Sequence, residues 1–349
     1  MSLTRRGKAA VAAVTALIVA GGAIGYFALF PEKAPGIVRT GLTSVGLVEE
    51  PPPPPPACPL NGLPAPHGVV PDRPALAVKV ENYPDARPQA GLQSADVIFE
   101  APVEGGITRF IVIYHCGDSP RVGPVRSART ADPDVLAQFG VPILAYAGGA
   151  PNVVRVIQEA NLVHLDETSG GPAFERDDSR LAPHNLYAGT KALYQVASST
   201  EPAPAPIFTY AEELTLRSRR VSSVHLPFSA TYADVWWSWG RKEGQWLRAH
   251  GDETHMAEEG EQVSADNVVV QLVDVVVGPR GGITPHLELV GSGKAYVFRD
   301  GRMIIGRWER SSLGHVTRFF AKDGTEIPLA PGRTWVEFLP STAAVETAH

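Results

Sequence analysis

The stretch ADVIFEAPVEGGITRFIVIYHC, residues 95–116, decides the fold because it places two apolar runs on either side of a glycine pair. Residues 95–106 and 107–116 are rich in β-branched and aromatic side chains, which is typical of strands. Gly105 and Gly106 suit a tight turn between them. The stretch therefore predicts a β-hairpin at the centre of the folded region.

Strand and helix signals alternate around this hairpin. They are a strand at 76–82, a helix with Asp132 as N-cap, Pro133 at its first position and Gly140 after its end, a strand at 141–147, and a second helix capped by Asn152. This order predicts an α/β or α+β domain over residues 58–200, with a mixed, partly parallel sheet covered by helices.

The second half of the chain has the pattern of a β domain. TEPAPAP, residues 200–206, is a connector, and short strand-like segments separated by Gly, Asp and Pro follow it. We expect a mainly β C-terminal domain over residues 207–340, built as a barrel or sandwich, and a disordered tail at 341–349.

The N-terminus predicts a membrane anchor. Arg5, Arg6 and Lys8 precede an uncharged, largely apolar run over residues 9–30, which as a helix spans about 33 Å and covers a bilayer core of about 30 Å. The basic segment 1–8 should stay in the cytoplasm, so the chain crosses the cell membrane once and its bulk is extracytoplasmic. A cleaved secretory signal is the alternative.

Residues 31–57 predict a proline-rich stalk. Pro51–Pro56 is an unbroken proline run, which as polyproline II makes a stiff spacer of roughly 19 Å. The two cysteines, Cys58 and Cys116, both follow the anchor, and on the outer side of a membrane they could form a disulfide. Two unlinked thiols are the alternative.

Charge and motifs exclude several classes of function. A net charge of -6 gives no sign of the basic surface that nucleic acid requires. No GxSxG elbow, GxxxxGK[ST] loop or GxGxxG after a strand occurs, so we expect no cofactor. His250, Asp252 and His255 could suggest a metal, but a solvated hairpin turn explains their spacing better and no metal site is assigned. Trp236, Trp237 and Trp239 favour a buried strand over a sugar-stacking platform.

Several long segments of the sequence resemble one family. They are PLNGLP (59–64), ARPQAGLQSADVIFEAPVEGGITRF (86–110), VGPVRSART (122–130), DSRLAPHNLYA (178–188), SADNVVVQ (264–271), GRWERSS (306–312) and PGRTWVEFLP (331–340). Together they are similar to the YerB-like family of bacterial lipoproteins. The resemblance implies an envelope-attached protein with two adjoining domains of unknown function and no established activity. This chain lacks a lipidation cysteine near the membrane, so residues 9–30 would replace the lipid.

The best candidate site is rich in arginine. Arg126 and Arg129 lie in the loop after the strand at 107–116 and just before the helix at Asp132, where a helix N-terminus and two guanidinium groups favour a carboxylate or phosphate. If the strands at 107–116 and 141–147 are parallel, their loops share one sheet edge. Pairing of the arginines with Glu100, Glu104 or Asp132 is the alternative. Further candidate ligand-binding residues in the family-like words are Arg109, Arg180 and Asn185.

These observations favour binding over catalysis. We expect a membrane-anchored envelope protein that binds an anionic wall polymer or a partner protein through the arginine-rich loop. The alternative is a wall hydrolase or transferase that acts on glycan or peptide, with Glu104, Asp177 or His184 in acid and base roles. No nucleophile, base and oxyanion arrangement can be identified in the sequence.

Overall fold

The computed structural model describes residues 55–229, 231–278 and 283–349, together with Tyr26 and Lys33. Residues Pro55–His349 form one compact unit. Apart from those two residues and the end of the stalk, the predicted segments 1–8, 9–30 and 31–57 lie outside the described residues. In the part of the chain that is described, no helix has both the length and the apolar character needed to cross a membrane.

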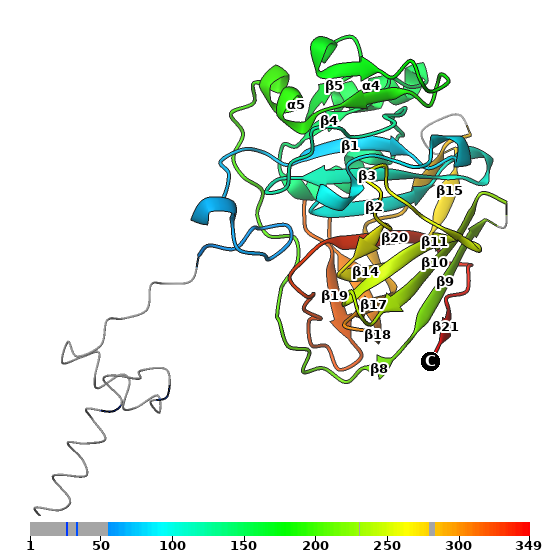
Figure 1. Cartoon of the computed structure of the whole chain (residues 1–349). Helices are drawn as coiled ribbons and strands as arrows, with labels where there is room; N and C mark the ends of the chain where they lie inside the picture. The colour runs from blue at the N-terminus through cyan, green and yellow to red at the C-terminus, as the bar shows by residue number, and fades with distance from the viewer. Residues whose placement is uncertain (1–25, 27–32, 34–54, 230, 279–282) are drawn as a thin grey trace, which may run out of the picture. The chain divides into compact units, whose positions relative to one another are not determined.

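The predicted hairpin is confirmed. β2 (Val97–Pro102) pairs antiparallel with β3 (Thr108–Tyr114). The turn between them contains Gly105 and Gly106, both with positive φ, which a glycine adopts without steric cost. Alternate residues of the hairpin enter two different cores, one on each face of the sheet. Both strands are therefore buried on both sides and lie at the centre of the molecule (Figure 1).

The N-terminal half extends the sheet from β3. β1 (Leu76–Glu81) pairs antiparallel with β3 and parallel with β4 (Ile143–Ala145), which pairs parallel with β5 (Val163–Leu165). Apolar residues of α3 (Asp132–Leu136) and α4 (Pro151–Glu159) enter one core, and Leu193 of α5 (Thr190–Ala197) enters the other. A small hairpin, β6 (Phe174–Arg176) with β7 (Leu186–Ala188), lies outside this sheet. The prediction of a mixed sheet with helices is confirmed.

The C-terminal half continues the same sheet. β20 (Thr334–Pro340) pairs parallel with β2 on one side and with β14 (Asn267–Val273) on the other. Beyond β14 come β17 (Gly291–Arg299), β18 (Arg302–Arg310) and β19 (Arg318–Ala321), and the short β8 (Arg219–Arg220) pairs with β18. Eleven strands from both halves thus form one sheet, while residues 200–206 between the halves contain neither helix nor strand.

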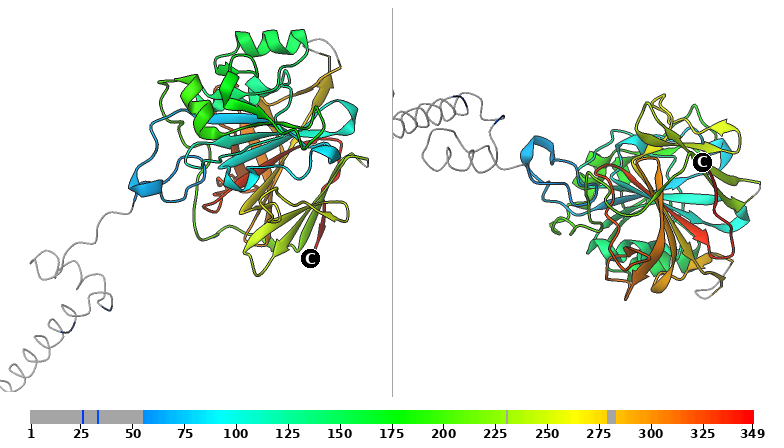
Figure 2. Two further views of the ribbon diagram at one scale, coloured as in Figure 1. Left: turned by 45° about the horizontal axis from the view of Figure 1, so that its top comes forward. Right: turned by 90° about the horizontal axis from the view of Figure 1, so that it is seen from below.

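A second sheet of six strands covers one face of the C-terminal half. Its strands are β9 (Ser223–Ser229), β10 (Ala233–Gly240), β11 (Gln245–His250), β12 (Glu253–Thr254), β13 (Ser264–Ala265) and β21 (Glu346–Ala348). Trp237 and Trp246 of this sheet share a core with Trp335 of β20. The mainly β character predicted for this half is confirmed, and the two sheets are visible side by side in Figure 2. A separate hairpin joins β15 (Val275–Val277) to β16 (Pro285–Leu287).

Three local predictions need correction. The tail at 341–349 is not disordered, because β21 pairs with β9 while Ala343 and Val345 pack against the core. The strands β3 and β4 are antiparallel to each other, since β1 lies between them and pairs antiparallel with β3 but parallel with β4. Asn152 is inside α4, which starts at Pro151 after Ala150, because a proline fits the first helical position.

A disulfide ties the start of the folded region to the end of β3. Cys58 and Cys116 are bonded, with their Cα atoms 6.1 Å apart and a sequence separation of 58. Cys58 is buried. The predicted pairing is therefore present.

Candidate functional site

Three of the predicted arginines meet at the edge of the central sheet where β1 and β4 end and β3 begins. Arg109 is in β3, and Arg126 and Arg129 are in the loop that leads to α3. The backbone N–H of Arg126 donates to the carbonyl of Lys79 (2.8 Å), and that of Ala147 donates to the carbonyl of Arg126 (3.0 Å). These hydrogen bonds fix the loop against the ends of β1 and β4. Arg109, Arg126 and Arg129 are called the arginine site below.

Arg126 is the most open member of the arginine site. Its Nε donates to Oε1 of Glu81 (2.9 Å), whose other oxygen contacts Nδ1 of His184 (2.8 Å). The ring of His184 stacks on Tyr83, with centroids 5.9 Å apart. The Arg126 side chain is 25% exposed, and its terminal nitrogens bond to none of the described residues. The Nε of Arg126 is therefore held by Glu81, while its terminal nitrogens can bind an anion.

Arg129 holds the loop in place. Its Nε and Nη2 contact Oε2 of Glu104 at 2.8 and 2.7 Å, and Nη1 donates to the carbonyls of Ser127 and Ala128. The other oxygen of Glu104 accepts a hydrogen bond from Thr284 (2.6 Å). The internal pairing of Arg129 with Glu104, which the sequence left open, is thus observed, and few of its N–H groups remain for a ligand.

Arg109 is buried without an ion-pair partner among the described residues. Its Nη1 donates to the Ser127 carbonyl (3.1 Å), while its buried Nε has no hydrogen-bond partner there. Burial, with the nearby charges of Arg129 and Arg126, lowers the pKa of Arg109 to about 10. The site thus leaves this guanidinium uncompensated.

A buried lysine adds to the same positive charge. Lys79 contacts Asp132 at 2.7 Å, and both side chains are buried. Burial nevertheless lowers the pKa of Lys79; the Asp132 carboxylate opposes that shift, and Arg109 and Arg129 add to it. The cations of this region are Lys79, Arg109, Arg126 and Arg129, and their carboxylate partners are Glu81, Glu104 and Asp132. Among the described residues, these groups leave one positive charge in excess, which favours an anion from outside.

The arginines, and not the end of α3, define the site. α3 is only five residues long, its N-cap is Ala131, and Asp132 lies inside it. The Asp132 carboxylate accepts a hydrogen bond from the Arg129 backbone N–H (2.7 Å), so it turns back to the loop and does not cap the helix. The prediction of Asp132 as N-cap is therefore wrong.

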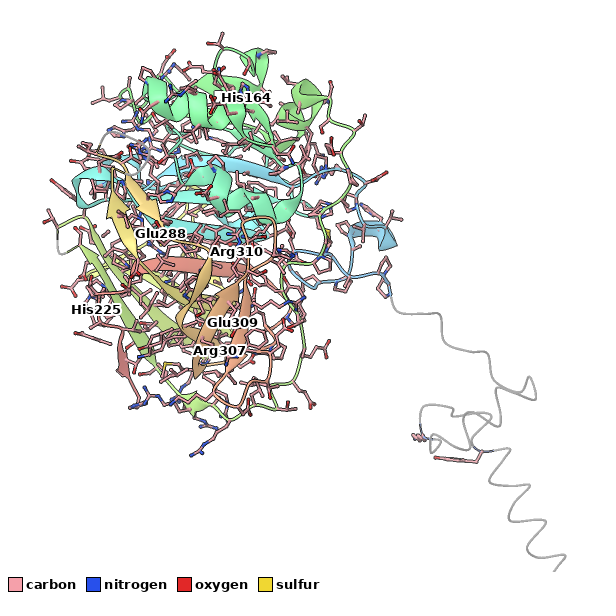
Figure 3. The ribbon with its side chains drawn as sticks, turned by 180° about the vertical axis from the view of Figure 1, so that it is seen from behind. His164, His225, Glu288, Arg307, Glu309 and Arg310 are labelled. Atoms are coloured by element: carbon pink, nitrogen blue, oxygen red, sulfur yellow. A yellow bond between two sulfur atoms is a disulfide. The ribbon has the colours of Figure 1, made fainter. Side chains whose placement is uncertain are left out.

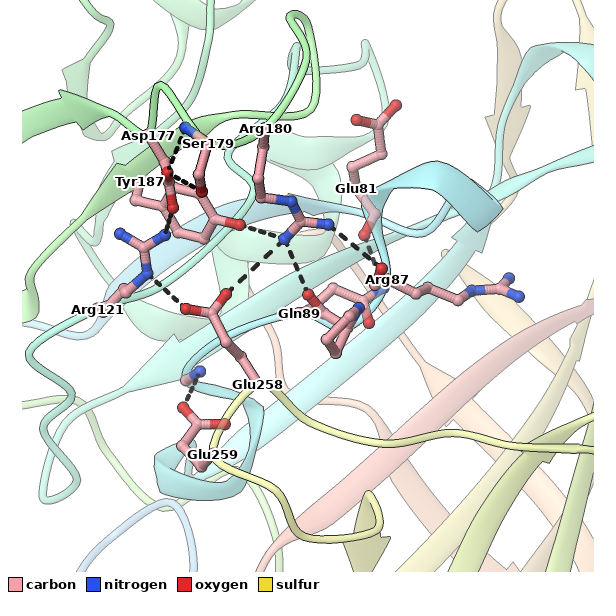
Figure 4. A network of polar contacts seen from close by, with 12 residues as sticks. Glu81, Arg87, Gln89, Arg121, Asp177, Ser179, Arg180, Tyr187, Glu258 and Glu259 are labelled. Carbon is pink, nitrogen blue, oxygen red and sulfur yellow. Dashed lines mark hydrogen bonds and ion pairs between the residues drawn. The ribbon is translucent and has the colours of Figure 1, made fainter.

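Asp177 and Arg180 belong to a separate surface network (Figure 4). Asp177 contacts Arg121, which also contacts Glu258 at 2.8 Å. Arg180 bonds to the hydroxyl of Tyr187 and lies 3.8 Å from Glu258. This network joins the loop before β7 to the segment after β12. Asn185 adjoins this network: its carbonyl accepts a hydrogen bond from the Asp177 backbone N–H (2.8 Å), and its side-chain oxygen accepts one from Arg176 (2.8 Å).

The carboxyl groups proposed as acid and base are not tuned for that role. Glu104 has a lowered pKa although burial opposes the shift, because Thr284 and Arg129 stabilise its charged form. Hydrogen bonds from Ser179 lower the pKa of Asp177. A general acid for glycoside hydrolysis needs a raised pKa. The two carboxylates also bond to different partners in different networks.

The structure contains a buried polar network that the sequence did not reveal. Glu100 of β2 contacts Arg248 of β11 at 2.6 Å, and both side chains are fully buried. Nη1 of Arg248 contacts Nε2 of His250 and Nδ1 of His255, so both imidazoles accept from it. Burial and the charge of Arg248 lower the pKa of both histidines. The partners are far apart in sequence, and no local motif marks them.

This network corrects the expectation for the histidine segment. The expected hairpin turn is present, since β11 pairs antiparallel with β12 and Asp252 in the turn is exposed. His250 and His255, however, are buried around Arg248 and are not solvated. The tryptophans follow strand alternation: Trp237 is fully buried and Trp239, two residues on, packs partly buried against the same core, whereas Trp236 lies on the other face of the strand. Trp236 stacks on His225 with ring centroids 4.3 Å apart.

Two family models match the two halves of the chain. The family model described as "Protein of unknown function (DUF3048) N-terminal domain" matches residues 60–203, and the model of the C-terminal domain matches residues 224–336. The chain is 28% identical over 297 residues to the Bacillus subtilis protein named "Putative lipoprotein YerB", which covers 82% of this chain and 87% of that protein. The crystal structure of YerB from Bacillus subtilis is similar with a TM-score of 0.73 and 25% identity, and the match covers 83% of this chain and 99% of the other.

Proposed function

This chain belongs to the DUF3048 family of proteins of unknown function, and from that premise we propose that it is a membrane-attached protein of the cell envelope whose arginine site binds an anionic group. The ligand is a carboxylate or phosphate on a wall polymer or a partner protein. The observation that carries the proposal is the excess positive charge around Arg109 and Arg126.

The attachment is inferred from two independent features. The relative from Bacillus subtilis has lipoprotein in its name, and a lipoprotein is held at a membrane. This chain has no cysteine before Cys58, but residues 9–30 are uncharged and long enough to anchor it. The folded part then faces the wall. Protease added to intact cells should degrade that part, whereas full protection of it, or its recovery from the cytosol, would refute the placement.

The binding role follows from the unused donors of the site. An arriving anion would meet the free end of Arg126 and would stabilise the charged forms of Arg109 and Lys79. A hydrolase role has less support, because a catalytic acid would need a raised pKa and neither Glu104 nor Asp177 has one.

Calorimetric titration tests the site. The full-length protein in nanodiscs is titrated with solubilised wall fragments, and separately with inorganic phosphate and with acetate. Arg126→Gln should weaken binding about tenfold, because one charge-assisted hydrogen bond contributes about 1.5–3 kcal/mol. Arg155→Ala is the matched control, since Arg155 is an exposed arginine on the neighbouring α4. If Arg126→Gln binds every probe as tightly as the unaltered protein while remaining folded, the arginine site is not the binding site.

A further inference from the structure

Basic side chains gather around β8, far from the arginine site in sequence. They line two hollows, one bordered by residues 216–219 and the other by residues 220–222. One hollow of about 490 Å³ is lined by Arg220, Arg241 and Arg302, and another of about 630 Å³ by Arg217, Arg219 and Lys322. Figure 1 shows β8 beside β18 at the lower end of the second half, with β21 nearby. These six residues are called the β8 basic surface.

The β8 basic surface is unpaired. None of its six side chains forms an ion pair with another residue in the described ranges. The acidic residues that line the hollows are already engaged: Asp300 contacts the buried Arg299 at 2.7 Å, and Asp323 accepts a hydrogen bond from the Thr325 backbone.

Arginines elsewhere on the same sheet behave differently. Arg307 contacts Glu309 at 2.6 Å within β18, a pair that Figure 3 labels. Arg318 of β19 contacts Glu326 at 2.7 Å. Surface arginines of this sheet can therefore form ion pairs with nearby carboxylates. The residues of the β8 basic surface do not.

Two of its arginines also oppose each other directly. In the antiparallel pairing of β8 with β18, Arg220 is the register partner of Arg302. Like charges opposite each other across two strands are destabilising. Within the described residues, the side chains of Arg219 and Arg302 make only long hydrogen bonds to the hydroxyls of Thr347 and Ser218, both 3.4 Å. In a chain with a net charge of -6, this concentration of positive charge without carboxylate partners suits an external polyanion.

The hollow lined by Arg220 also has an aromatic wall. Trp239 lies there partly exposed, close above Gly301, and its indole is held against Trp246 with ring centroids 5.3 Å apart. A fixed indole beside guanidinium groups offers a flat face to a sugar or polyol and donors to a phosphate.

We propose that the two hollows beside β8 form a binding groove for a phosphodiester-linked polymer of sugar or polyol units. A bilayer surface is the less suitable partner, because membrane-surface sites combine basic residues with exposed apolar anchors. Among the described residues, the exposed large apolar side chains lie elsewhere, such as Leu181, Val277 and Ile283, and none of them lines either hollow.

The test uses the full-length protein in nanodiscs of neutral lipid and titrates it with poly(glycerol phosphate). Binding should be saturable and should weaken with salt, because each phosphate contact releases counterions. Arg220→Ala with Arg302→Ala should weaken it about tenfold, and Arg217→Ala with Arg219→Ala should weaken it through the second hollow. Arg318→Ala is the control and should bind like the unaltered protein. The same double variants made in an Arg126→Gln background should still lose affinity, which separates this groove from the arginine site.

Three results would overturn the proposal. One is unchanged binding when both double variants are folded by thermal unfolding. Another is binding only to phosphatidylglycerol vesicles, which would assign the surface to a membrane. The third is equal affinity for a single-stranded oligonucleotide of the same charge, which would show that the groove does not select sugar or polyol phosphates.

Discussion

Glu100 of β2 and Glu337 of β20 are register partners on neighbouring parallel strands, and both side chains are fully buried. Arg248 pairs with Glu100, while the indole of Trp237 donates to one oxygen of Glu337 (2.8 Å). Burial, and then the charge of Glu100, raise the pKa of Glu337 well above its usual value. Glu337 therefore keeps its proton to a higher pH than a carboxyl group in water does.

This proton makes stability depend on pH in a defined direction. The pKa of Glu337 is higher in the folded protein than in the unfolded chain. Its contribution to the free energy of unfolding is therefore fully present below the unfolded pKa of about 4.3, and it is lost as the pH rises toward the folded pKa. Glu337→Gln mimics the neutral acid, so its stability relative to the unaltered protein should rise with pH by up to about 1.4 kcal/mol per unit. Urea unfolding between about pH 5 and pH 9 measures this difference. Glu213→Gln, at an exposed site, should show no such trend.

The ion pair between Glu100 and Arg248 should show strong coupling. Arg248→Met leaves a buried carboxylate without its cation, which should cost about 3–5 kcal/mol. Adding Glu100→Gln should restore part of that loss, because the charge that needs the cation is gone. A double-mutant cycle by chemical denaturation measures the coupling. Additive losses would show that the two side chains act independently.

The disulfide should contribute substantially to stability. It closes a loop of 58 residues, for which chain entropy gives about 4 kcal/mol. Cys58→Ser with Cys116→Ser should lower the unfolding midpoint, and reductant should lower that of the unaltered protein to a similar value. A reductant effect that persists in the double variant would mean that another process is responsible.

The arginine site should respond to the loss of a negative charge as well as of a positive one. Glu81→Gln keeps a side chain that can accept from Arg126 but removes the charge shared by Arg126 and His184. Anion binding should tighten several-fold at low salt, and the gain should shrink as salt screens the site. Calorimetry at two salt concentrations checks this. Weaker binding in a folded Glu81→Gln protein would contradict the charge argument.

The elements that were predicted correctly depend on neighbours in sequence. The hairpin at 95–116 has its own turn glycines and apolar alternation, and both family-like halves contain strands with similar local signals. Local reasoning failed where a distant segment decides the outcome. The tail at 341–349 looks polar and short by itself, yet β9 offers it a free edge.

The sites follow the same rule. Arg129 and Glu104 are 25 residues apart, and their pairing could be considered from the sequence. Glu100 and Arg248 are 148 residues apart, and nothing in either segment points to the other. The β8 basic surface was not predicted because the net negative charge of the chain hides it. Arg217, Arg219 and Arg220 are neighbours in sequence, but only the fold brings Arg241, Arg302 and Lys322 beside them.

The parallel pairing of β2 with β20 has a practical consequence for anyone who wishes to produce the protein in pieces. A fragment that stops near residue 206 would leave β2 as a naked margin of hydrogen-bonding groups, and the complementary fragment would leave β20 in the same condition. Each fragment should aggregate when expressed alone, whereas co-expression should allow the two fragments to assemble. The two halves thus fold together as one unit.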